Sequence, residues 1–267
     1  MTAIVRTLTP QGFALVADGR CSNSENYAVI SDEVQKIFPV TCPVGVFALC
    51  FSGADGFTSL DSGEQLKLPQ LAMRCATSLE GRKCANAVGY AHRLSRCINE
   101  GIKEFSLGGS IHSGTSAQPN LADEFGDTIC RIALVGIENI PNGKKASAVD
   151  LRFYHVNGVL RDPEVKPETP LLIGGYIGYS PSQIVGHLVC NRPKEDERLS
   201  AYRRPMKEPD EVTLQDAIEG ATAFILAHSD PEAIEIDDKC RAVGGHIHSA
   251  TITPDEGFQW VTAPKRK

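Results

Sequence analysis

The chain has 267 residues, a formal net charge of −6 and charges of both signs scattered along its length. This balance lacks the basic stretches that bind nucleic acid or an anionic membrane, so we expect neither as a partner. The apolar runs are too short for a transmembrane helix, and the N-terminus does not resemble a secretory signal, so we expect a cytoplasmic protein.

No linker rich in proline, glycine and serine divides the sequence. We therefore predict a single domain over residues 1–267, which is long enough to bury a substantial core. The nine cysteines are an odd number and contain no C-x-x-C pair. They indicate a reducing compartment, in which most of them are small buried apolar side chains.

The N-terminal part has the pattern of antiparallel strands. Residues 3–8 and 13–17 are apolar runs separated by the turn residues Thr9-Pro10-Gln11-Gly12, which predicts a hairpin. Two more strands are predicted over residues 36–40 and 45–51. The second of these is apolar throughout, as expected of a strand covered on both faces.

Helices and a second group of strands follow. Pro69 is predicted to interrupt the first helical stretch, whereas apolar residues recur at helical spacing through residues 82–105. Residues 106–127 are rich in Gly, Ser, Asn and Pro and predict a long loop. The strand-like runs 128–137 and 146–156 are joined by a strong hairpin signal.

The C-terminal part is predicted to contain a short strand at residues 171–175 and helices at 181–191 and 213–228. Thr213 is the expected N-cap of the last helix, with Asp216 three residues on. The charged, proline-rich stretch 191–211 is predicted to be an exposed insertion, and 245–253 with 257–262 a final hairpin. Alternating blocks of strands and helices predict an α+β fold with two stacked sheets between helical layers.

Thr2 is the candidate nucleophile. If the initiator Met1 is removed, Thr2 carries a hydroxyl group and a free α-amine that can act as its own base. The amine has a reference pKa of roughly 7.7 to 8.0, which suits neutral pH. Because a small second residue usually permits removal of the methionine, we expect Thr2 to be exposed without a propeptide.

The spacing of Thr2 with Asp18, Lys36 and Ser52-Gly53 resembles the proteasome β-subunit and HslV-type peptidase family of N-terminal nucleophile hydrolases. In that family a Thr, an Asp after the second strand, a Lys at the third and a Ser-Gly turn after the fourth recur in this order. Glycine turns at residues 173–175 and 243–248 match more loosely. The resemblance covers nearly all of the chain except 106–127 and 191–211, and it implies a four-layer αββα sandwich.

The resemblance also implies a threonine peptidase that works through an acyl-enzyme on Thr2. Lys36, held by Asp18, would favour the neutral amine and the deprotonated hydroxyl through its positive charge. The N–H of Gly53 would donate to the oxyanion, a contribution of about 3 kcal/mol. Arg20 would complete the ionic cluster around these residues.

The chain departs from the family pattern at the support for the Thr amine. Gly175 stands where the family usually has a serine, although Ser180 and Ser182 follow closely. Cys240 and Val243 stand where the eukaryotic and archaeal subunits have an Asp and a Ser near the final glycine pair.

No cofactor or metal is expected for this chemistry. His246 and His248, two residues apart on a predicted strand, could bind a metal, but without a third ligand in register we interpret them as structural. The partners that the resemblance implies are a polypeptide substrate, a homo-oligomeric ring of this chain and a separate ATPase that could feed it.

Two other functions stay open. The same nucleophile serves many amides, so the chain could be a small-molecule amidase or acylase, with its long loops building a closed pocket. It could also be a non-catalytic structural subunit of a proteasome-like assembly, which retention of Met1 would support.

Overall fold

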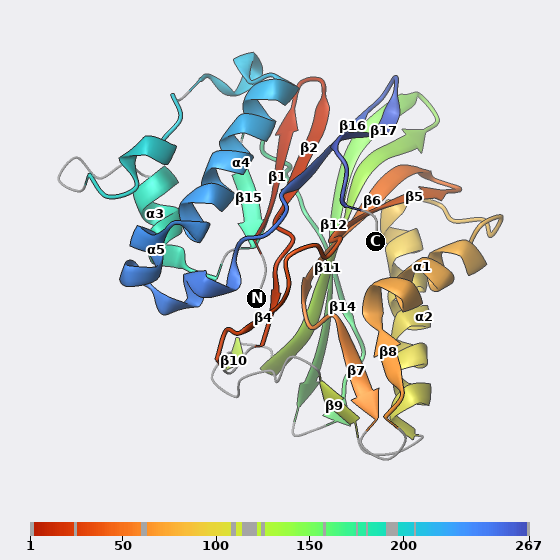
Figure 1. The fold of residues 1–267 in the computed structure, drawn as a ribbon. Coiled ribbons are helices and arrows are strands. Elements are labelled where there is room, and N and C mark those ends of the chain that lie inside the picture. The colour runs from red at the N-terminus through yellow and green to blue at the C-terminus, as the bar shows by residue number, and fades with distance from the viewer. Residues whose placement is uncertain are drawn as a thin grey trace. The chain divides into compact units, whose positions relative to one another are not determined.

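The computed structural model describes residues 3–23, 26–59, 63–107, 111–113, 122–123, 126–156, 159–174, 176–179, 181–190, 197–205 and 207–265 (Figure 1). The chain divides into two compact units, one made of residues 1–36 and 172–267 and the other of residues 37–171. Each unit combines antiparallel sheet with α-helix, which confirms the predicted α+β class. The single domain over residues 1–267 stays a prediction.

The first unit is built on a five-stranded antiparallel sheet in the order β15-β1-β2-β16-β17. These strands are β1 (Ile4–Thr9), β2 (Gly12–Ala17), β15 (Tyr176–Tyr179), β16 (His248–Thr253) and β17 (Gly257–Thr262). The predicted N-terminal and C-terminal hairpins are both confirmed as β1–β2 and β16–β17. Since β16 pairs with β2, the two hairpins lie side by side although they stand at opposite ends of the chain.

Helix α4 (Leu214–Ser229) covers one face of this sheet and runs along β1 and β2 (Figure 1). Its buried side chains pack against alternate residues of the two strands, which share one face because side chains alternate along a strand. This apolar core contains Ala3, Val5, Ala14, Val16, Ala217, Ile218, Ala221 and Ile225. Thr213 begins the helix with the predicted capping box, in which Asp216 is the reciprocal partner.

Shorter elements complete the described part of the first unit. They are α3 (Gln183–Cys190), α5 (Pro231–Ile236), the 3-10 turns η1 (Ser200–Tyr202), η2 (Pro209–Glu211) and η3 (Asp238–Ala242), and the small sheet of β3 (Cys21–Ser22) and β4 (Val29–Ser31). The turns η1 and η2 lie in the stretch predicted as an insertion, whose residues 191–196 and 206 lie outside the described part.

The second unit contains, among its described residues, a seven-stranded and a three-stranded antiparallel sheet. The larger sheet consists of β5 (Ile37–Cys42), β6 (Gly45–Gly53), β10 (Ala122–Asp123), β11 (Gly126–Ile140), β12 (Gly143–Val156), β13 (Val159–Leu160) and β14 (Glu164–Pro167). The smaller one consists of β7 (Gly56–Ser59), β8 (Gln65–Lys67) and β9 (Ile111–Ser113). The predicted hairpin around Pro141 and Asn142 is confirmed as β11–β12.

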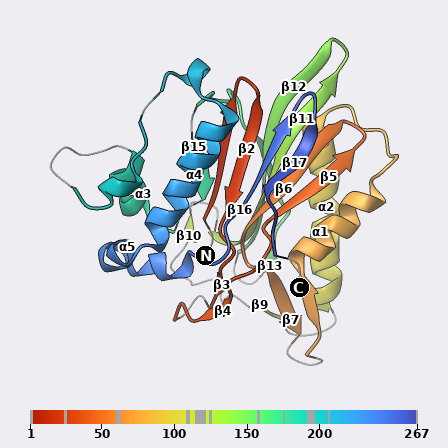
Figure 2. The ribbon, with the colours of Figure 1, turned by 45° about the horizontal axis from the view of Figure 1, so that its top comes forward.

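Helices α1 (Leu68–Ser78) and α2 (Ala87–Leu107) of the second unit lie side by side, as Figure 2 shows. Tyr90, Leu94, Ile98 and Ile102 recur at helical spacing along α2 and are fully buried. They belong to the same core cluster as the large side chains of β6 and β11, so α2 is held by its apolar stripe.

Three predicted elements differ in the structure. Pro69 lies in the first turn of α1 and does not interrupt it, because the N–H that proline lacks has no partner in a first turn. Residues 171–174 form a single bridge, Leu8 to Ile173, and not a strand. Gly174, at φ 74°, turns the chain there, and the strand beside β1 begins only at Tyr176.

The predicted loop 106–127 contains the short strands β9 and β10, and β11 begins at Gly126 rather than at 128. Residues 108–110, 114–121 and 124–125 of this stretch lie outside the described part. Among the described residues, none of the helices combines the length and the apolar character needed to cross a bilayer.

Candidate active site

Asp18 is the centre of a buried polar cluster in the first unit. Its side chain is fully buried and accepts four hydrogen bonds from other described residues. Oδ1 accepts from Lys36 Nζ at 2.6 Å and from the backbone N–H of Ala3 at 2.9 Å. Oδ2 accepts from the backbone N–H groups of Gly244 at 3.2 Å and Arg20 at 3.3 Å. A carboxylate removed from water needs such donors, and here both oxygens have two.

Lys36 is the buried cation of this cluster. Its side chain is 6% exposed, and Nζ donates to Asp18 Oδ1 and, at 2.7 Å, to the carbonyl oxygen of Arg20. A buried ammonium group is stable only when it is paired and hydrogen-bonded. The carboxylate and the carbonyl together fix the position of the charge.

The β1–β2 hairpin explains why Asp18 reaches the N-terminus. Ile4 is paired with Ala17, so the next residues along each strand, Ala3 and Asp18, also face each other, and Asp18 N donates to Ala3 O at 3.1 Å. The predicted nucleophile, Thr2, lies outside the described residues. Its covalent neighbour Ala3 is bound to the carboxylate that also holds the ammonium group of Lys36.

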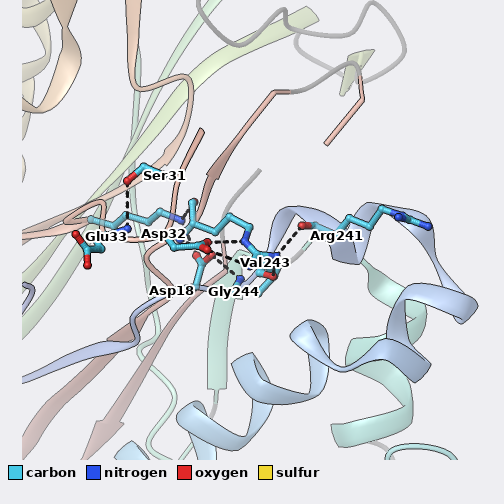
Figure 3. Close-up of polar contacts among 9 residues, drawn as sticks. Asp18, Ser31, Asp32, Glu33, Arg241, Val243 and Gly244 are labelled. Carbon is cyan, nitrogen blue, oxygen red and sulfur yellow. Dashed lines mark hydrogen bonds and ion pairs between the residues drawn. The ribbon is translucent and has the colours of Figure 1, made fainter. Parts of the chain in front are cut away.

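Arg20 contributes to the cluster through its backbone, because its guanidinium group pairs with a different acid. Nε donates to Asp32 Oδ1 at 2.7 Å, and one terminal nitrogen donates to the carbonyl oxygens of Arg241 and Val243, each at 3.2 Å. Figure 3 shows Asp32, Arg241, Val243 and Gly244 gathered beside Asp18. Arg20 therefore joins the segment before β16 to the loop after β2.

Two consecutive glycines allow this segment to approach so closely. Gly244 and Gly245 have φ values of 146° and 73°, which residues other than glycine rarely adopt. A Cβ atom on Gly245 would lie 2.5 Å from the carbonyl oxygen of Asp32, which accepts a hydrogen bond from the N–H of His246 at 2.8 Å. The glycine pair is what brings the Gly244 N–H to Asp18.

His248 and His246, which we interpreted as structural, make separate contacts. His248 Nε2 accepts the backbone N–H of Lys36 at 3.1 Å, whereas His246 Nε2 lies 2.9 Å from the carbonyl oxygen of Ala263. Burial lowers the pKa of His248 to about 4, and the charge of Lys36 acts in the same direction. Within the described residues, no group of three acidic, Cys or His side chains is placed to hold a metal ion.

Gly53 ends β6 in the second unit, where it pairs with Cys130 of β11. Its φ of 98° and the 2.8 Å that would separate a Cβ atom from the carbonyl oxygen of Ile129 explain why glycine stands there. Its role as oxyanion donor stays a prediction.

The register between β15 and β1 shows which end of each strand lies near the N-terminus. Tyr179 is paired with Ile4 at the start of β1, whereas Gly174 donates to the carbonyl oxygen of Leu8 near the other end of that strand. The residue after Tyr179 is Ser180, which lies outside the described part, as does Gly175. The aromatic and β-branched run before Ser180 was the sequence signal for a strand at that place.

The comparison with solved structures identifies proteins of similar fold. Anbu (ancestral beta-subunit) from Yersinia bercovieri superposes with a TM-score of 0.52 at 12% identity, covering 97% of this chain and 87% of that one. The structure of the helical assembly of the Anbu complex from Pseudomonas aeruginosa gives 0.53 at 12% identity, covering 99% and 88%. No protein-family model matches the chain, and no curated protein matches it either.

These similarities show the fold alone. The assignment to proteasome β-subunits and HslV-type peptidases is wrong, because the similar solved structures are Anbu proteins and no family model supports the assignment. A Thr, Asp, Lys and Ser-Gly order at similar spacing is too short a signal to separate related groups of one fold.

Proposed function

We propose that this chain is an Anbu-like amide hydrolase with an N-terminal threonine nucleophile, and that its substrates are peptides. One observation carries the proposal: Asp18 Oδ1 accepts hydrogen bonds from both Lys36 Nζ and the N–H of Ala3. A buried ammonium group is thereby held by the same oxygen atom as the backbone next to Thr2.

In this mechanism the Thr2 hydroxyl attacks the carbonyl carbon of the scissile amide and its α-amine takes the proton. The proton then passes to the leaving amine, and water hydrolyses the ester that remains on Thr2. The charge of Lys36 favours the neutral amine and the developing alkoxide, and Asp18 holds Lys36. We retain Gly53 as the proposed oxyanion donor, together with the four-layer αββα arrangement that this role requires.

We also propose that the chain self-associates, because the Pseudomonas aeruginosa protein of similar fold was solved as a helical assembly. A closed ring and a separate ATPase stay predictions from the sequence. Self-association would also suit a purely structural subunit, so it does not by itself support catalysis.

The test is the intact mass of the full chain before and after incubation with a peptide epoxyketone, which needs both a Thr hydroxyl and its free amine. We expect loss of Met1 and one adduct. Thr2→Ala should give no adduct, whereas Thr2→Ser keeps the hydroxyl and should react. An unblocked Thr2 without an adduct, or a retained Met1, would contradict the mechanism and favour the structural subunit.

A panel of fluorogenic peptides and small acyl amides then separates the two enzyme classes. Turnover of peptides that is lost in Thr2→Ala supports the peptidase. Turnover of acyl amides alone would identify the small-molecule amidase or acylase.

A further inference from the structure

We propose that His248 is a positioning residue for Lys36, and that it acts by accepting the hydrogen bond of the Lys36 backbone N–H. The inference rests on the proposed function, because it assigns a purpose to a contact inside that site. It concerns a residue 212 positions away from the lysine in the sequence.

The backbone of Lys36 has no strand to hold it within the first unit. The chain is irregular from Glu33 to Lys36, and Lys36 is the last residue before β5. A buried N–H outside a ladder must find another partner, and this one finds His248 Nε2 at 3.1 Å. Asp18 and the Arg20 carbonyl oxygen hold the other end of the side chain, at Nζ. Both ends of Lys36 are therefore anchored.

His248 is itself held firmly enough to serve as an anchor. It begins β16 directly opposite Ala17, the residue before Asp18, and its ring is 1% exposed. Its ring and that of Trp260 of β17 lie in a T-shaped arrangement at a centroid distance of 6.1 Å. Since β2 and β16 are paired, the strand register sets the place of Asp18, which directly follows β2, relative to His248, the first residue of β16.

The hydrogen bond also defines the chemical state of the ring. An imidazole nitrogen that accepts an N–H bond must carry its lone pair, so Nε2 is unprotonated and the proton of the neutral ring is on Nδ1. A protonated ring could not accept this bond. The neutral ring therefore places no second positive charge beside Lys36.

Three substitutions separate this role from simple packing. The Oε1 atom of a glutamine lies as many bonds from Cβ as His248 Nε2 does, so His248→Gln can keep the acceptor. His248→Asn carries an acceptor one bond too short, and His248→Leu carries none. We expect the variants His248→Leu and His248→Asn to lower kcat by about 10- to 100-fold, as small misplacements of catalytic groups do, and to leave KM nearly unchanged. His248→Gln should restore most of the lost kcat.

Hydrogen exchange of the Lys36 amide supplies a readout that does not depend on activity. We expect the amide to be protected in the wild type and in His248→Gln, and to exchange faster in His248→Leu and His248→Asn. The ¹⁵N resonances of the His248 ring should identify Nε2 as the unprotonated nitrogen.

The outcomes distinguish the two proposals. If the wild type forms the epoxyketone adduct but all three variants keep its kcat, the role of His248 is overturned and the proposed function stands. If the wild type forms no adduct, the proposed function fails, and amide exchange alone decides whether His248 anchors Lys36. Should His248→Leu fail to fold, His248→Asn against His248→Gln gives the same comparison.

Discussion

In the buried pair of Asp18 and Lys36, we predict that replacing Asp18 lowers the free energy of unfolding more than replacing Lys36 does. In Asp18→Asn, an NH₂ group replaces one oxygen atom, yet both oxygens of Asp18 face two N–H donors each. Either orientation of the amide therefore sets donor against donor, and it leaves the ammonium group of Lys36 without a counter-ion. Removing one partner of a buried pair costs about 3–5 kcal/mol, so we expect the free energy of unfolding to fall by this amount.

In Lys36→Met the carboxylate keeps its three backbone N–H donors, from Ala3, Arg20 and Gly244. Such donors stabilise a buried carboxylate. The free energy of unfolding should therefore fall by only about 1.5–3 kcal/mol, the contribution of one hydrogen bond to a charged group. The double variant should recover part of the Asp18→Asn loss, because no uncompensated ammonium group remains.

Urea unfolding followed by the fluorescence of Trp260, the only tryptophan of the chain, measures these changes in the first unit. The midpoint should shift with an unchanged slope. If Lys36→Met is the more destabilising of the two, or if Asp18→Asn lies within about 1 kcal/mol of the wild type, the assignment of donors around Asp18 is refuted.

Three further changes test other parts of the first unit. Thr213→Ala removes the N-cap of α4 and should cost about 1 kcal/mol in urea unfolding. Gly245→Ala should destabilise by more than about 1 kcal/mol, because it combines a φ of 73° with a clash against the backbone of Asp32. Acidification should lower stability between pH 6.5 and 4. The His248 pKa is about 4 in the folded chain but 6.5 as its ordinary value, so the unfolded chain binds more protons in this window. The loss of stability reaches about 3 kcal/mol near pH 4 and disappears about one pH unit above the unfolded pKa of 6.5.

Each of these has its control. Thr213→Ser keeps the capping oxygen and should behave like the wild type. Gly81→Ala also places a side chain at positive φ, but a Cβ atom there meets nothing within 4 Å, so it should cost less than Gly245→Ala. His248→Gln should flatten the pH dependence between 6.5 and 4, and an unchanged slope in that variant would assign the effect to another group. The buried His228, whose pKa burial also lowers, is the first to test in that case.

Much of the site could be predicted because its parts are local in the chain. The β1–β2 hairpin follows from two apolar runs around turn residues, and it brings Asp18 beside Ala3 within 15 residues of sequence. The pairing of Asp18 with Lys36 was what the family resemblance implied, and the need of a buried ammonium group for a counter-ion agrees with it. The family assignment failed because a few residues at a given spacing are too short a signal to identify one group of proteins.

The sequence by itself determined the α+β class, the two hairpins and the start of α4, because periodicity, turn residues and caps act over a few residues. Only the tertiary structure decided which groups complete the cluster. Gly244 and His248 lie 226 and 212 residues from the atoms they bind, and no local signal joins them. Their contacts exist because β16 pairs with β2, and strand order depends on the packing of the whole sheet against α4.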